Sequence, residues 1–135
     1  MQNENVKLAP FVQPDFELDE KTRKSLLSDS ENEGQVIVHC TYHSLGESLR
    51  IWKTTFLIDK ETGHRSRLLH AGNITFYPEW MPVPPGTTAR FTLVFSRLPK
   101  GCKVFSLLED IPQMGGFHIK NIRRNKSDVY HVEIV

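Results

Sequence analysis

The chain has no long apolar run, almost no net charge and only two cysteines, and each absence removes a class of protein from consideration. No uninterrupted apolar stretch approaches the roughly 18 residues that a membrane-spanning helix needs. Lys and Arg number 17 against 16 Asp and Glu, so the formal net charge is +1 and no long-range field attracts polyanions. We therefore expect neither nucleic acid nor a membrane among the partners.

A secretory signal is also missing from the first residues. Residues 1–14 contain no cationic start followed by an apolar stretch of about 7–15 residues. If the chain is complete, we expect a cytoplasmic protein. If a leader was removed, we expect a periplasmic or extracellular one.

The two cysteines, Cys40 and Cys102, do not favour a disulfide. With Trp52 between them they have the order of the Cys–Trp–Cys arrangement of antibody domains. In that arrangement both cysteines are central in strands, whereas Cys102 directly follows Lys100-Gly101, which is typical of a turn. We expect two free thiols: Cys40 buried and inert in an apolar row, and Cys102 partly exposed.

A chain of 135 residues fits one domain and can bury a core without disulfides or metals. Residues 35–135 are expected to form this domain. Residues 1–34 are expected to pack on it, with a short helix over Leu18–Ser28 or a strand over Phe11–Leu18, followed by a polar loop.

Apolar and polar residues alternate at period two in short runs separated by turns, as in half-buried antiparallel strands. The apolar rows are Val36/Val38/Cys40/Tyr42, Trp52/Thr54/Phe56/Ile58, Phe91/Leu93/Phe95, Phe105/Leu107, Phe117/Ile119 and Tyr130/Val132/Ile134. Turn signals stand at residues 59–63, 84–87 and 99–101. The pattern predicts an all-β, antiparallel two-sheet sandwich of six to eight strands with at most one short helix. Trp52, the largest apolar side chain on these rows, is expected in the core.

The chain from Val36 to Val135 also resembles a known type of domain. The residues that carry the resemblance are Leu68–Ile74, Trp80, Phe91–Phe95 with the following Leu98-Pro99, Phe105–Glu109 and Phe117–Ile122. They look like a small immunoglobulin-like β-sandwich of bacterial proteins, often placed beside a thioredoxin-like or other domain. The resemblance implies an immunoglobulin-like fold and an accessory role, and it brings no catalytic residues to carry over.

Histidines offer the pattern closest to a metal site, but their spacing does not favour one. His39 and His43 share a face of one strand roughly 13 Å apart, while Cys40 between them points to the other face. A ligand set would need His64, His70, His118 or His131 from other strands. We interpret these side chains as surface histidines and expect no metal and no cofactor.

Two further polar features have structural interpretations. Glu109 closes an apolar strand, and we expect it to anchor the bend by accepting backbone N–H groups. A basic cluster with neighbouring aromatics could grip single-stranded nucleic acid, although the balanced overall charge favours a solvated turn. The cluster consists of Lys120, Arg123, Arg124 and Lys126. No nucleophile motif of a hydrolase is present, and we expect no enzyme.

The most unusual segment is Phe76–Pro85, which has four prolines in eight residues and cannot be a central strand. Its aromatic and apolar side chains are candidate partner contacts, namely Tyr77, Trp80 and Met81. The alternative is that Trp80 folds inward and covers an open end of the fold. We predict a non-enzymatic protein-interaction or scaffolding module, a monomer or weak homodimer with an unknown protein partner. The alternative function is a sandwich that binds carbohydrate or a small molecule through Tyr77 and Trp80.

Overall fold

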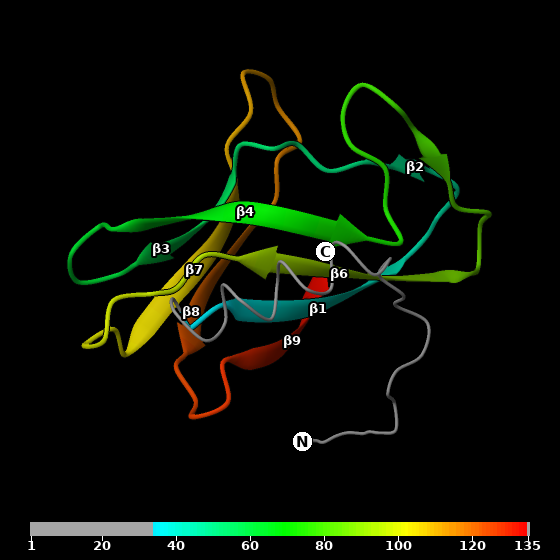
Figure 1. The fold of residues 1–135 in the computed structure, drawn as a ribbon. Coiled ribbons are helices and arrows are strands. Elements are labelled where there is room, and N and C mark those ends of the chain that lie inside the picture. Colours follow the sequence, from blue (N-terminus) through cyan, green and yellow to red (C-terminus); the bar gives the residue numbers. More distant parts are fainter. Residues whose placement is uncertain (1–33, 135) are drawn as a thin grey trace.

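The computed structural model describes residues 34–134, and all regular structure in this range is β-strand (Figure 1). The strands are β1 (Val36–His43), β2 (Ser48–Leu49), β3 (Thr55–Asp59), β4 (Arg65–Gly72), β5 (Met81–Pro82), β6 (Thr88–Phe95), β7 (Val104–Glu109), β8 (His118–Arg123) and β9 (Val129–Ile134). The all-β class is therefore confirmed for this range. The helix or strand expected between residues 11 and 28 lies outside the described residues.

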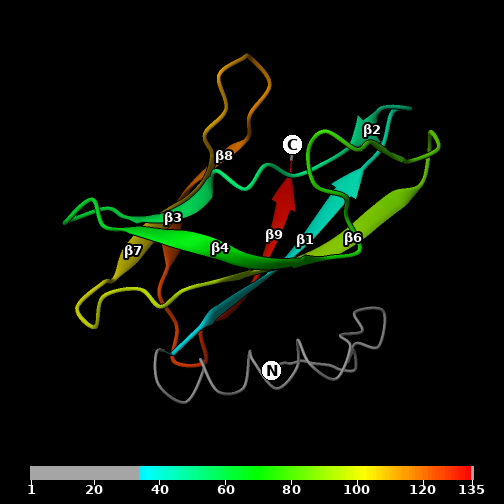
Figure 2. The ribbon, with the colours of Figure 1, turned by 45° about the horizontal axis from the view of Figure 1, so that its top comes forward.

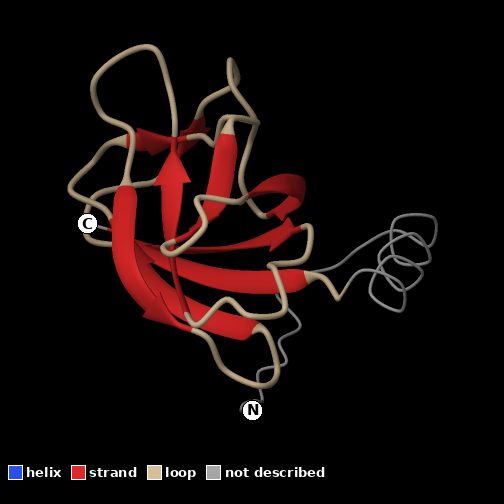
Figure 3. Cartoon of the chain, turned by 90° about the vertical axis from the view of Figure 1, so that its left-hand side faces the viewer, coloured by secondary structure: helices blue, strands red, loops and turns tan. Residues whose placement is uncertain are grey.

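Seven strands form one sheet in the order β8-β7-β3-β4-β6-β1-β9, and β2 and β5 form a separate two-stranded ribbon. The large sheet curls into a nearly closed, barrel-like shape, in which neighbours are antiparallel except for the parallel pair β1 and β9 (Figure 3). This arrangement differs from the expected antiparallel two-sheet sandwich. Extra residues in β4, at its pairing with β6, and in β8, at its pairing with β7, provide the physical reason, because bulges bend and twist a strand and let one sheet wrap around the core.

Side chains from opposite parts of the curled sheet fill its interior. The expected inward rows of β1, β6, β7 and β9 are confirmed, with fully buried side chains on each of the first three strands: Val36, Val38, Leu93, Phe95, Phe105 and Leu107. Phe105 of β7 meets Tyr130 of β9 edge to face, with ring centroids 5.0 Å apart. Because these strands lie far apart in the sheet order, this contact closes the core across the interior.

The expected facing of the third strand is wrong. The alternate set is buried, namely Thr55, Leu57 and Asp59, whereas the row from Trp52 to Ile58 points outward or to the rim. The two polar members, Thr55 and Asp59, can be buried because their side chains form hydrogen bonds to nearby residues of the chain. Thr55 Oγ1 donates to the carbonyl of Trp52 at 2.6 Å, and Asp59 accepts from Thr62 Oγ1 at 2.7 Å within the hairpin turn. Trp52 is half-buried and lies outside the core.

Both cysteines are free and buried, so the expected absence of a disulfide is confirmed. The expectation that Cys102 is partly exposed is wrong. Its backbone N–H donates to Pro99 O at 3.0 Å, which folds the turn back, and its thiol approaches Val104 O at 3.6 Å. Burial raises the pKa of the Cys40 thiol, and burial together with the nearby Asp59 carboxylate raises that of Cys102.

Two irregular parts project on the same side of the curled sheet. They are the connection between β7 and β8 and the ribbon of β2 and β5, visible in both ribbon views (Figure 1 and Figure 2). In the ribbon, Met81 pairs with Leu49 and Pro82 pairs with Ser48. The ribbon is short because the prolines that follow cannot continue the backbone pairing. We call this end of the molecule the barrel mouth; it includes β2, β5 and the connection over residues 110–117.

Candidate functional site

Four side chains at the barrel mouth form one stacked group, which we call the aromatic–arginine cluster: Arg50, Trp52, Tyr77 and Trp80. Trp52 and Tyr77 are stacked, with ring centroids 3.7 Å apart and an interplanar angle of 26°. The Arg50 guanidinium lies 3.7 Å from the ring centroid of Trp80 and 4.6 Å from that of Tyr77. Such distances allow cation–π attraction, so the guanidinium joins the two rings.

Backbone hydrogen bonds bring these residues together from two segments distant in sequence. Ile51 N donates to Thr75 O at 2.8 Å, and Tyr77 N donates to Ile51 O at 2.8 Å. A third bond, from Arg50 Nη1 to Pro78 O at 3.2 Å, fixes the guanidinium. Residues 50–52 therefore lie beside residues 75–78, although neither segment belongs to the large sheet.

The proposed contact residues differ in exposure. Trp80 is 56% exposed and Tyr77 is 47% exposed, so the tryptophan does not fold inward to cover the end of the fold. Met81 is partly buried in the ribbon, where it pairs with Leu49. Sequence reasoning identified Tyr77 and Trp80 but missed Arg50 and took Trp52 for a core residue, because the pairing that unites them is long-range.

A cavity of about 520 Å³ opens beside the cluster at the barrel mouth, and we call it the mouth cavity. Its walls include Arg50, Trp52, Trp80, Glu109, Met114 and Phe117. One wall is the connection between β7 and β8, which packs tightly on the end of β7 at Gly116. A Cβ at this position would collide with Glu109 O, so only glycine permits the approach.

Glu109 combines burial with charge inside this cavity. It is 7% exposed, and its Oε2 accepts a hydrogen bond from Trp52 N at 3.2 Å, which confirms the expected anchoring role. Burial raises the pKa of Glu109, while the N–H groups of Trp52 and Phe117 and the positive charge of Arg50 partly oppose the shift. Arg50 and Glu109 thus influence each other through space, yet they are not among the ion pairs of the described residues.

A second cavity of about 520 Å³ lies on the outer face of β6, β1 and β9. Here His39 and His131 stack with ring centroids 5.0 Å apart, and His39 Nδ1 lies 2.8 Å from Thr92 Oγ1. His43 is engaged with Glu133 at 3.1 Å. Between residues 34 and 134, no three His, Cys, Asp or Glu side chains are grouped as metal ligands would be.

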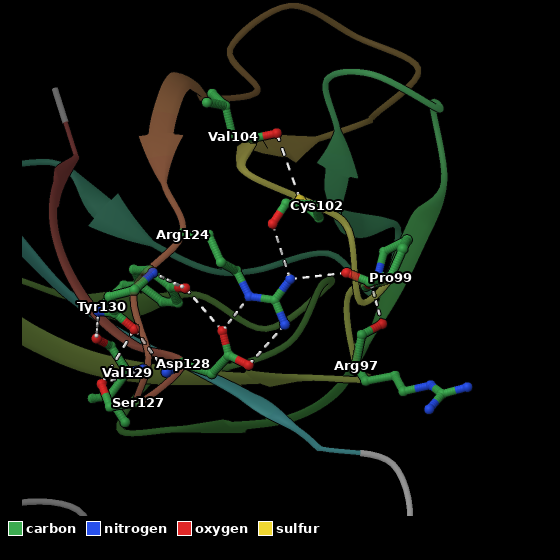
Figure 4. Close-up of polar contacts among 11 residues, drawn as sticks. Arg97, Pro99, Cys102, Val104, Arg124, Ser127, Asp128, Val129 and Tyr130 are labelled. Atoms are coloured by element: carbon green, nitrogen blue, oxygen red, sulfur yellow. Dashed lines mark hydrogen bonds and ion pairs between the residues drawn. The ribbon is translucent and has the colours of Figure 1, made fainter.

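The opposite end of the molecule carries a polar network around Arg124, shown in Figure 4. Arg124 Nε and Nη2 donate to the Asp128 carboxylate at 2.6 and 3.0 Å, and Nη1 donates to Pro99 O at 2.9 Å. Tyr130 Oη donates to the same carboxylate at 2.9 Å. Arg124 is therefore held by the fold rather than presented to a polyanion with Lys120, Arg123 and Lys126, and the network is structural.

Comparison of the chain with protein-family models, with curated proteins and with solved structures gives no match. Over residues 34–134, no helix has the length and apolar character to cross a membrane. A functional proposal therefore depends on the geometry of the molecule itself. The barrel mouth is the part in which exposed aromatics, a cavity and a buried charge coincide.

Proposed function

We propose that this protein is a non-enzymatic interaction module that binds a segment of a protein partner across the aromatic–arginine cluster. The observation that carries the proposal is that Tyr77 and Trp80 are about half exposed while Trp52 and Arg50 hold them in place. Trp, Tyr and Arg dominate the energetic centres of protein interfaces. Aromatic side chains that are already ordered lose little conformational freedom on binding, which favours affinity.

The side chains of the barrel mouth favour binding over catalysis. A hydrolytic or transfer enzyme places a nucleophile beside a base that a third group orients. The charged side chains lining the mouth cavity are Arg50 and Glu109, and each already has a contact, with Pro78 O and with Trp52 N. These contacts favour a fixed recognition surface over a reactive one.

A small-molecule or carbohydrate ligand is the second candidate, and the mouth cavity favours it. Its volume of about 520 Å³ is within the range of ligand pockets, and such pockets occur in the mouths of barrels. A sugar ring needs an open aromatic face. Arg50 already stacks on Trp80, and Trp52 already stacks on Tyr77, which reduces the open aromatic surface and favours a protein segment.

The test is affinity capture with three single variants. Trp80→Ala and Tyr77→Ala remove the two exposed rings, and Leu45→Ala removes an apolar side chain that is 86% exposed in a turn outside the cluster. A partner recovered by the wild type and by Leu45→Ala is expressed and purified, and its dissociation constant is measured for all four proteins. We expect each ring variant to bind roughly 30-fold more weakly, as hot-spot losses of about 2 kcal/mol imply. Unchanged melting temperatures check that the fold is intact, and equal affinities for all variants would refute the proposal.

A further inference from the structure

The buried carboxylate of Glu109 is not explained by its anchoring role alone. A glutamine at this position would offer a carbonyl oxygen to Trp52 N–H without the cost of removing a charge from water. Glu109 is 7% exposed and forms no ion pair among the described residues. A buried charge without a counter-ion is costly, so a charge at this position is expected to have a use.

Arg50 does not supply the missing counter-ion. Its guanidinium stacks against Trp80 and donates to Pro78 O at 3.2 Å. Its charge helps to keep Glu109 ionised, since it opposes the rise in the pKa of that carboxyl. The described hydrogen bond uses one of five N–H groups of Arg50. The mouth cavity therefore has the Glu109 carboxyl in its wall, and Arg50 adds further N–H donors to that wall.

The walls of the mouth cavity suit a long aliphatic side chain that ends in a positive charge. Trp52 and Phe117 provide aromatic surface near Glu109, and aromatic faces attract ammonium groups. Met114, which is 95% exposed, and the half-exposed Trp80 also line the cavity. Such apolar side chains pack well against methylene groups, and the stem of a lysine is known to lie along apolar surface.

We propose that the mouth cavity binds a lysine side chain of the partner segment. The ammonium group contacts the Glu109 carboxylate, the four methylenes lie between Trp80 and Met114, and backbone carbonyls of the partner accept hydrogen bonds from Arg50. This inference rests on the proposed function and adds the residue that the partner contributes. A lysine residue offers both groups that the cavity needs, namely an ammonium for Glu109 and backbone carbonyls for Arg50, joined by a flexible aliphatic side chain.

The first test uses small probes and nuclear magnetic resonance of the ¹⁵N-labelled protein. Nα-acetyl-lysine methylamide carries the charge and the carbonyls, whereas Nα-acetyl-norleucine methylamide carries the carbonyls alone and n-butylammonium the charge alone. We expect the lysine probe to shift the resonances of the Trp52 indole and the Glu109 and Phe117 amides, and to bind at least tenfold more tightly than the norleucine probe. Butylammonium binding as tightly as the lysine probe would instead indicate a free amine as the ligand. Absence of shifts, or equal shifts with norleucine, would overturn the proposal.

Glu109→Gln is the matched variant, because it keeps an acceptor for Trp52 N–H and removes the charge. We expect it to bind the lysine probe and the captured partner at least tenfold more weakly, while its stability at pH 7 is increased. If Glu109→Gln binds the partner normally while Trp80→Ala does not, the lysine inference is wrong and the interaction module stands. If neither variant changes partner binding, the proposed function fails as well.

Discussion

Trp52 stacks on Tyr77 with ring centroids 3.7 Å apart, and this contact joins two segments that belong to different parts of the chain. The backbone bonds of Ile51 to Thr75 and Tyr77 bring the rings side by side. Tyr77 stays about half exposed, so the stack does not close the core but holds a ring at the surface. Trp52 is therefore a positioning residue for the aromatic–arginine cluster.

Trp52→Ala should destabilise the protein only moderately. The change removes a stack worth about 0.5–1.5 kcal/mol together with part of a half-buried surface, so we expect the free energy of unfolding to fall by roughly 1–2.5 kcal/mol. Leu57→Ala, at a fully buried position, should cost about 2–5 kcal/mol. Urea unfolding of both variants provides the comparison. A Trp52→Ala variant as unstable as Leu57→Ala would mean that the indole belongs to the core.

Local patterns determine which face of most strands is buried, and these faces were predictable. The rows beginning at Val36, Phe105 and Tyr130 are buried as their alternation indicates. β3 is the exception, because the more apolar row, which begins at Trp52 before the strand, points outward, whereas the buried row contains Asp59. Burial alone would raise the pKa of Asp59, but hydrogen bonds from Thr62 Oγ1 and Glu61 N outweigh it and lower the pKa. The hydrogen bonds of this one turn thus allow the Asp59 carboxylate to be buried.

Strand pairing and the candidate site depend on contacts that a local pattern does not contain. The parallel pairing of β1 with β9 joins the two ends of the described chain, and nothing in either alternating row specifies it. The proline spacing identified Tyr77 and Trp80 as unusual. Arg50 could not be added to them from sequence, because its place depends on the long-range bridge between Ile51 and Phe76. The anchoring role of Glu109 at a strand end could be predicted from its neighbours in sequence, and the hydrogen bond from Trp52 N confirms it.

The stability of the wild type relative to Glu109→Gln should depend on pH. The pKa of Glu109 is raised in the folded state by burial, so the folded protein favours the neutral carboxyl more than the unfolded chain does. The protonated Glu109 side chain therefore contributes fully to stability below the pKa that Glu109 has in the unfolded chain. This contribution is lost as the pH rises through the higher pKa that Glu109 has in the folded protein. We expect Glu109→Gln to be the more stable protein at pH 7 and the difference to shrink toward pH 4. Urea unfolding at a series of pH values measures it, and a difference that does not vary with pH would contradict the assignment.

Both cysteines should be unreactive in the folded protein. Burial raises the pKa of the Cys40 and Cys102 thiols, so little thiolate is present at neutral pH. Titration with a thiol reagent in denaturant, without reductant, should find two thiols per chain, whereas the native protein should react far more slowly. Rapid reaction of one thiol in the native state would show that the structure around it opens readily and exposes it to solvent. The variants Cys40→Ser and Cys102→Ser would identify the reactive cysteine.

The clasp formed by Arg124, Asp128 and Tyr130 should stabilise the pairing of β9 with β1. Asp128 O accepts from Ile37 N at 2.9 Å, so the residue that binds Arg124 also begins the parallel pairing. Asp128→Asn retains a residue type that tolerates the φ of 55° at this position, but it removes the charge from the pair. We expect the free energy of unfolding to fall by roughly 1.5–3 kcal/mol, as for hydrogen bonds to a charged group.

The matched control for this prediction is Asp110→Asn, which also removes one charge from an aspartate–arginine pair. Arg65 and Asp110 are 3.3 Å apart with side chains 46% and 54% exposed, whereas those of Arg124 and Asp128 are 20% and 19% exposed. Water screens the exposed pair, so Asp110→Asn should change stability by less than about 1 kcal/mol. Hydrogen exchange at Ile37 N–H should accelerate in Asp128→Asn and remain unchanged in Asp110→Asn. Equal effects of the two substitutions would mean that the clasp contributes no more than a surface ion pair.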